Sequence, residues 1–190
     1  MTSTKHLIIG LIVASSLGMA SQASATLLDG QTVTYQYLFP DLSSNYSGAD
    51  NGDYVVGLGV EVLNVADDRA TMDISDTNLY VDYGSSSLWT PSSFNGFRIT
   101  DTYALIPNFT SVTIDAATNM SGLDISRITF DANNIWVNWQ GLNFDTNTIV
   151  SLNISSDGGN GGSVPEPTSV ALLGLGLAGL GVSRRKAIAK

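Results

Sequence analysis

Apolar and polar residues alternate along most of the chain between residues 33 and 154. A period of two is typical of strands that bury one face, and clusters of Ser, Asn, Asp and Gly separate the runs as turns do. No stretch of this region has the period of a helix. The runs that predict strands lie at residues 33–39, 54–62, 70–74, 79–83, 97–99, 112–114, 128–130, 135–139 and 150–154. We therefore predict an all-β fold of about nine or ten strands, a single antiparallel β-sandwich with jelly-roll or immunoglobulin-like wiring.

One hairpin can be placed from its turn. The alternating residues 128–130 are followed by Asp131-Ala132-Asn133-Asn134 and then by the alternating residues 135–138. Asp and Asn tolerate the left-handed backbone that tight turns require. Residues 131–134 are therefore predicted to be the turn of a β-hairpin.

The N-terminus has the parts of a secretory signal peptide. Lys5 and His6 precede a short apolar stretch, and small residues follow as far as Ala23-Ser24-Ala25. An A-x-A triplet in this position is a typical cleavage site, and the apolar stretch is too short for a first transmembrane helix. We predict that residues 1–25 are removed and that the β domain, residues 26–156, is exported.

The C-terminus has four consecutive parts. Residues 157–163 are rich in glycine and predict a flexible linker. It leads to Val164-Pro165-Glu166-Pro167, which we expect to be extended because residues before proline avoid the helical region. An apolar run at 168–183 is predicted to be a transmembrane helix. A basic end at 184–190, which begins with Arg184, Arg185 and Lys186, is predicted to be a cytoplasmic stop.

The apolar run is short for a permanent anchor. Its residues 168–182 would span about 22 Å as a helix, whereas a bilayer core is about 30 Å thick. Four glycines, at positions 174, 176, 179 and 181, weaken it further. Such a segment suits a transient anchor in the inner membrane. The signal peptide and the positive-inside rule both place the β domain outside the cytoplasm.

The order of proline motif, apolar run and basic end resembles the PEP-CTERM tail of exported proteins in Gram-negative bacteria. The resemblance covers residues 164–190 and implies processing by exosortase, a membrane protease, after the export machinery has acted. In such a tail Pro165, Glu166 and Pro167 are the recognition element. The same tail is also known as the ice-binding protein C-terminal domain. We expect no ice binding from it, because a membrane anchor presents no flat lattice of hydroxyl groups.

Composition narrows the chemistry of the exported part. Between residues 26 and 163, fifteen Asp and one Glu stand against three Arg, which gives a net charge of −13. This surface repels nucleic acid, so nucleic-acid binding is not expected. The chain has no Cys, and its one histidine, His6, lies in the predicted signal peptide. Thiolate zinc sites and His-dependent catalytic triads are therefore excluded from the mature chain.

The acidic turns offer weak candidates for calcium. Asp50, Asn51 and Asp53 surround a glycine and carry oxygen ligands, and Asp67-Asp68 or Asp131 with Asn133 are further candidates. None has the spacing of an EF-hand loop. The alternative, which we favour, is that these side chains bond their own backbone in turns. No cofactor is required by the sequence.

Three tryptophans and one glutamate are the remaining candidates. Trp136 and Trp139 lie an odd number of residues apart, so they point to opposite faces of one strand. A platform of tryptophans that stacks on sugars would then require Trp89 as a partner. Glycosidase chemistry needs two carboxylates, and Glu61 with a nearby Asp is the candidate pair. The place of Glu61 among valines favours an outward-facing residue of a strand.

These observations predict a non-enzymatic exported protein of the cell surface or extracellular matrix. Its setting, by the resemblance, is an extracellular polysaccharide or biofilm matrix. The alternative is a carbohydrate-binding module, with calcium as an optional ligand. A glycosidase is the third and weakest hypothesis.

Overall fold

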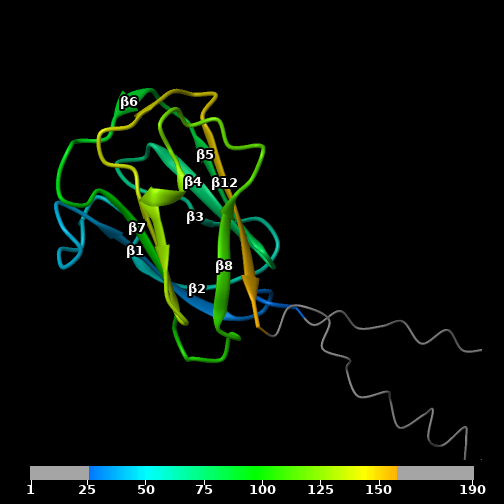
Figure 1. Ribbon diagram of the computed structural model, residues 1–190. Helices are drawn as coiled ribbons and strands as arrows, with labels where there is room; N and C mark the ends of the chain where they lie inside the picture. Colours follow the sequence, from blue (N-terminus) through cyan, green and yellow to red (C-terminus); the bar gives the residue numbers. More distant parts are fainter. Residues whose placement is uncertain (1–25, 158–190) are drawn as a thin grey trace, which may run out of the picture.

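The computed structural model of the chain describes residues 26–157, and these residues form two five-stranded antiparallel sheets. The first sheet has the strand order β2-β1-β7-β10-β9. Its strands are β1 (Thr32–Leu38), β2 (Gly52–Val55), β7 (Gly96–Asp101), β9 (Ile128–Phe130) and β10 (Asn134–Asn138). Figure 1 shows how this sheet lies beside the second one.

The second sheet has the strand order β3-β4-β5-β12-β8. Its strands are β3 (Val60–Val62), β4 (Ala70–Ser75), β5 (Asn78–Tyr83), β8 (Phe109–Ile114) and β12 (Ile149–Ser156). A separate short ladder joins β6 (Ser87–Leu88) to β11 (Asn143–Phe144), and a 3-10 helix η1 (Ile125–Arg127) precedes β9. The all-β, antiparallel character predicted from the sequence is confirmed, with twelve strands in residues 26–157 in place of nine or ten.

One core lies between the two large sheets, because alternate residues from both sheets join a single cluster of buried side chains. The alternate residues Val33, Tyr35 and Tyr37 of β1 are buried, as are Leu79, Val81 and Tyr83 of β5. These are the apolar positions of the predicted strands. Burying one side of each sheet against the other is what the alternating pattern requires.

The predicted hairpin at residues 128–138 is confirmed. β9 pairs with β10 in the register Ile135–Phe130, Trp136–Thr129 and Val137–Ile128. The Asp131 carboxylate closes the turn, because its Oδ1 accepts the backbone N–H of Asn133 at 2.9 Å and of Asn134 at 2.8 Å. These hydrogen bonds lower the pKa of Asp131.

The prediction of one strand over residues 54–62 is wrong. The chain leaves the first sheet after Val55 and enters the second sheet at Val60, so the segment contributes to two sheets. Gly59 adopts φ of +96°, a conformation that non-glycine residues rarely reach. The Glu61 carboxylate holds the crossover by accepting the N–H of Gly57 at 3.0 Å and of Ile74 at 2.7 Å.

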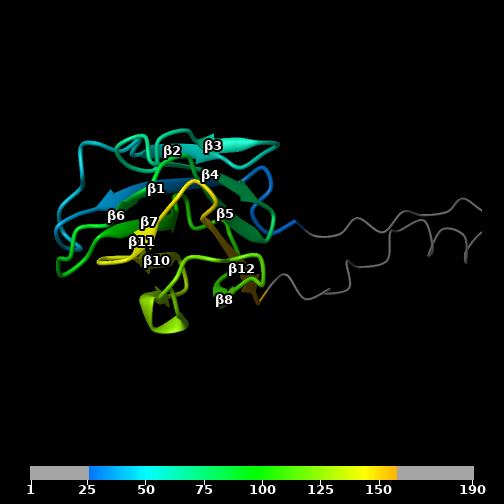
Figure 2. The ribbon, with the colours of Figure 1, turned by 90° about the horizontal axis from the view of Figure 1, so that it is seen from above.

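The chain enters and leaves the domain at the same end. The Leu28 N–H donates to the carbonyl of Asp76, and the Ile154 N–H donates to that of Thr77, both within the turn between β4 and β5. Figures 1 and 2 show the first and last described residues, in blue and orange, at the same end of the domain. We call this end the tail end and the opposite one, with β6 and β11, the far end.

Predictions for residues 1–25 and 158–190 lie outside the described residues. They comprise the signal peptide with Ala23 and Ala25, the sorting motif 164–167, the transmembrane helix 168–183 and the basic end. Among residues 26–157, no helix is long and apolar enough to cross a membrane.

Candidate functional site

Two of the three tryptophans are part of the core. Trp89 is 6% exposed and Trp139 is fully buried, and their rings stack at 5.5 Å between centroids and 9° between planes. A sugar-binding platform of two exposed tryptophans would require Trp89 on the surface, whereas the structure places Trp89 in the core. The residues before Trp89, in β6, show no alternation of apolar and polar side chains, so no pattern in the sequence indicates that it is buried.

Hydrogen bonds fix the polar atoms of this aromatic cluster. The Tyr37 hydroxyl donates to Asn95 Oδ1 at 2.6 Å and accepts the Trp139 Nε1–H at 2.8 Å. The Trp89 Nε1–H donates to the Tyr83 hydroxyl at 3.2 Å. Burial raises the pKa of both tyrosines, Tyr37 and Tyr83. These phenols are structural at every pH at which the domain is folded.

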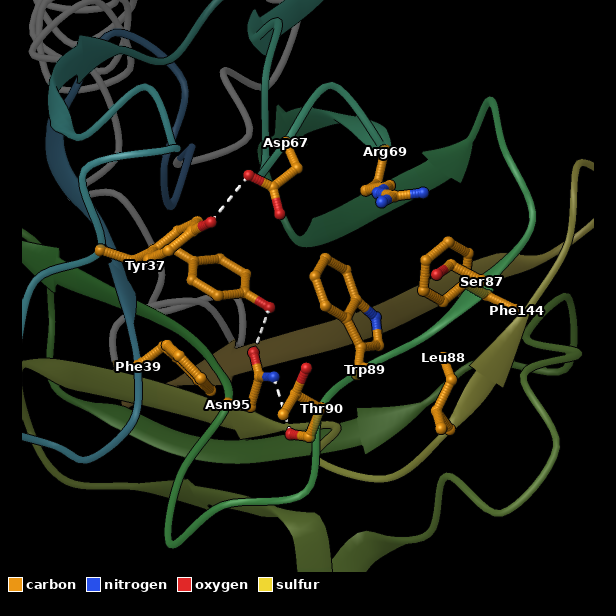
Figure 3. A pocket seen from close by; sticks show the side chains of 11 residues that line it. Tyr37, Phe39, Asp67, Arg69, Ser87, Leu88, Trp89, Thr90, Asn95 and Phe144 are labelled. Atoms are coloured by element: carbon orange, nitrogen blue, oxygen red, sulfur yellow. Dashed lines mark hydrogen bonds between the residues drawn. The ribbon is translucent and has the colours of Figure 1, made fainter.

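A small pocket at the far end opens over this cluster. It holds about 190 Å³, and Figure 3 shows Trp89 at the middle of its lining, with Asp67 and Arg69 on one side and Thr90 and Asn95 on the other. The Asp67 carboxylate accepts the hydroxyl of Tyr46 at 2.8 Å, and this bond raises the pKa of Tyr46. A volume of about six waters admits one small ring or group but no larger ligand.

The third tryptophan lies at a larger groove on the outer face of the first sheet. Trp136 is half-buried between the buried residues Ile135 and Val137, so its ring faces away from the core. The groove holds about 700 Å³, within the range of ligand sites. Its lining consists of Leu42, Ser93, Phe94, Asp124, Ser126, Arg127, Thr129, Trp136, Asn138 and Gln140.

The groove combines an aromatic floor with polar walls. Strand register places Thr129, Trp136, Arg98 and Gln36 in one row across four neighbouring strands. The Arg98 guanidinium donates to Gln36 Oε1, whereas its buried Nε has no hydrogen-bond partner among the described residues. That Trp136 and Arg98 are neighbours on the outer face of the first sheet was not predicted from the sequence. The odd spacing of Trp136 and Trp139 was the usable signal that one ring faces outward.

The weak calcium candidates do not converge on a common point. Asn51 Oδ1 accepts the backbone N–H of Tyr37 at 2.6 Å, and its amide donates to the carbonyl of Tyr46. Asp53 Oδ1 accepts the Thr34 hydroxyl at 2.6 Å. Asp50 contributes its carbonyl to the Tyr54 hydroxyl. Over residues 26–157, no group of three acidic or imidazole side chains gathers into a metal site.

The other acidic candidates are positioned by the backbone. Asp67 and Asp68 occupy the two left-handed positions of a tight turn, with φ of 51° and 52°. Glu61 is half-buried and accepts two backbone N–H groups, as described above, rather than facing solvent freely. These carboxylates stabilise turns and a crossover between the sheets.

The comparison with protein families finds a match outside the described domain. The model of the PEP-CTERM protein-sorting motif matches residues 163–186, a range that includes the predicted sorting residues 164–167 and 184–186. Searches of the curated proteins and of the solved structures found no match. The chain therefore carries a PEP-CTERM protein-sorting motif, which marks it as an exported surface protein that the membrane enzyme exosortase processes.

Proposed function

We propose that the chain is a structural protein of the extracellular surface or matrix, held only briefly in the inner membrane. Residues 1–25 direct export, residues 168–183 anchor the chain, and exosortase then releases the β domain near Pro165-Glu166-Pro167. The single observation that carries the proposal is the family match at residues 163–186. The net charge of −13 in the exported part supports a soluble, non-adhesive body after release.

The intact mass of the released protein tests both processing steps. We expect a polypeptide that begins at Thr26 and ends within or near the sorting motif. Deletion of residues 165–167 should leave the full-length tail on the protein and keep it in the membrane fraction. Deletion of residues 160–162 from the linker removes as many residues and should leave processing intact. Removal of the C-terminal tail from both deletion variants alike would contradict the sorting role.

A second candidate function is the binding of a neutral polysaccharide in the Trp136 groove. A half-exposed indole beside hydroxyl and amide side chains suits a sugar ring, which has apolar faces and polar edges. The acidic surface disfavours polyanions by charge repulsion. The groove lining has one carboxylate, Asp124, which accepts the N–H of Ser126, so we propose binding without hydrolysis.

Pull-down on insoluble neutral polysaccharides and a glycan array test this binding. We expect Trp136→Ala to weaken binding at least tenfold, the effect of losing about 1.4 kcal/mol of stacking. Tyr80→Ala removes a partly exposed aromatic ring from the second sheet and should leave binding unchanged. EDTA should have no effect, because the proposed contacts are stacking and hydrogen bonds. An equal loss of polysaccharide binding in Trp136→Ala and Tyr80→Ala would argue against binding in the Trp136 groove.

A further inference from the structure

Two loops at the tail end expose large apolar side chains. Leu58 is fully exposed in the loop between β2 and β3, and Tyr103 and Leu105 are 63% and 69% exposed in the loop between β7 and β8. The two loops flank the start of β1. The Val56 N–H donates to the carbonyl of Gln31, and the Thr102 N–H donates to that of Thr32.

Each loop is braced by a carboxylate. Asp101 accepts the N–H of Ile106 at 2.9 Å and those of Tyr103 and Leu105 at 3.3 Å. Ile106 is buried, so it holds the loop to the domain while its neighbours face outward. Glu61 braces the other loop at Gly57 in the same way. The apolar tips are therefore held in place by satisfied backbone groups.

The loop that carries Tyr103 and Leu105 lies beside the point at which the chain leaves the domain, and the loop that carries Leu58 lies beside the point at which it enters. The Asp157 N–H donates to the carbonyl of Asn108 at 3.1 Å, at the end of the loop that carries Tyr103 and Leu105. β2 and β7 are separated by two strand spacings across β1, so the two loops begin about 10 Å apart. The exposed apolar residues of both loops thus lie at the tail end of the domain, one loop near the entry of the chain and the other near its exit.

The length of chain after Asp157 brings this end close to a membrane. Ten residues, 158–167, separate the domain from the apolar run at 168. A segment of ten residues spans at most about 35 Å. A short tether gives a high effective concentration, so even a weak contact between the tips and the bilayer is populated.

We propose that, while the tail anchors the chain, the tail end of the domain rests on the bilayer with Leu58, Tyr103 and Leu105 in the headgroup layer. Tyrosine and leucine side chains are typical of such interfacial contacts. The acidic domain makes this contact apolar rather than electrostatic, so neutral headgroups suffice. This inference rests on the proposed anchor. It also points the Trp136 groove and the small pocket away from the membrane.

The absence of cysteine from the chain allows a direct test. The chain from Thr26 to Lys190 is reconstituted in phosphatidylcholine vesicles that carry a nitroxide-labelled headgroup. A fluorophore is attached at a single cysteine, in Leu58→Cys or Leu105→Cys. Matched controls are Leu42→Cys and Leu88→Cys, which are 56% and 48% exposed and belong to the far end. We expect at least twofold stronger quenching at positions 58 and 105 than at positions 42 and 88.

A second variant tests whether the apolar side chains make the contact. A probe at Asp29→Cys, exposed at the tail end, should be quenched less when Leu58, Tyr103 and Leu105 are all replaced by serine. Equal quenching of the probes at both ends of the domain would overturn the proposal. Dimers that cross-link through a cysteine at position 105, with no quenching there, would also overturn it, because a second copy of the domain would then cover the apolar side chains. Chains recovered in the supernatant would contradict the anchor and this proposal together. Chains that stay on the vesicles with unquenched probes would contradict this contact alone.

Discussion

The Tyr37 hydroxyl joins both sides of a buried hydrogen-bond network, and its removal tests how far the core depends on it. In Tyr37→Phe the ring and its packing remain, but Asn95 Oδ1 and Trp139 Nε1 each lose a partner. A buried polar atom without a partner costs about 1–3 kcal/mol. Two such atoms, partly offset by the hydroxyl that no longer has to be buried, give an expected loss of about 3 kcal/mol.

Urea unfolding of the chain from Thr26 to Ser163, followed by tryptophan fluorescence, measures this loss. With a slope of about 2 kcal/mol/M, the midpoint should fall by about 1.5 M. Tyr80→Phe is the matched control, because the Tyr80 hydroxyl has no hydrogen-bond partner among the described residues. We expect the control to change stability by no more than about 0.5 kcal/mol. A midpoint for Tyr37→Phe within about 0.3 M of the control would refute the reasoning.

Four further predictions concern a backbone glycine, the Glu61 carboxylate and the dependence of stability on pH. Gly96→Ala should prevent folding or lower the free energy of unfolding by more than about 4 kcal/mol, because a Cβ at position 96 would lie 1.9 Å from the Val137 carbonyl oxygen. The control is Gly84→Ala, where a Cβ would meet no atom within 4 Å, and its stability in the same urea assay should be near that of the parent. Glu61→Gln should lower the free energy of unfolding by about 1–2 kcal/mol, because the amide NH2 of glutamine cannot accept one of the two backbone N–H groups that the Glu61 carboxylate accepts. The control is Asp82→Asn at an exposed site. Equal urea midpoints for the two variants would contradict the role of Glu61 in holding the crossover. Burial raises the pKa of Tyr35, Tyr37 and Tyr83. The free energy of unfolding should therefore keep its full value below pH about 10 and fall above it, where these tyrosines ionise in the unfolded chain first. If the phenolate absorbance of all the tyrosines rises before the domain unfolds, this prediction is wrong. The pKa of Asp131 is lowered, so its contribution to stability should be lost as the pH falls below about 4. In Asp131→Asn this loss of stability at low pH should be smaller.

Much of the fold could be predicted because the domain consists of strands that bury one face. The alternating residues of β1, β4, β5, β10 and β12 are buried where the pattern placed them. The hairpin at 128–138 was predictable because its turn is local, with Asp131 bonded to the next few residues. Local hydrogen bonds and a period of two are properties of the sequence itself.

The features that were missed depend on contacts between distant residues. The segment 54–62 alternates without interruption, yet its crossover between sheets is set by Gly59 and by a bond from Glu61 to Ile74 on another strand. Trp89 is buried because it meets Trp139, fifty positions away in the chain. Its neighbours form a strand of two residues, which is too short to produce a pattern. The groove was missed for the same reason, since its lining comes from η1, β9, β10 and the loops around them.

The position of β12 has a mechanical consequence. This strand is an interior strand of its sheet, paired with β5 on one side and with the edge strand β8 on the other, and it leads directly to the exit at Asp157. Hydrogen bonds of antiparallel strands run across the strand direction, so a pull on the tether loads both ladders in shear and strains many bonds simultaneously. A tether joined to an edge strand could instead be peeled away one bond at a time. The domain is therefore attached through the strand best suited to bear load.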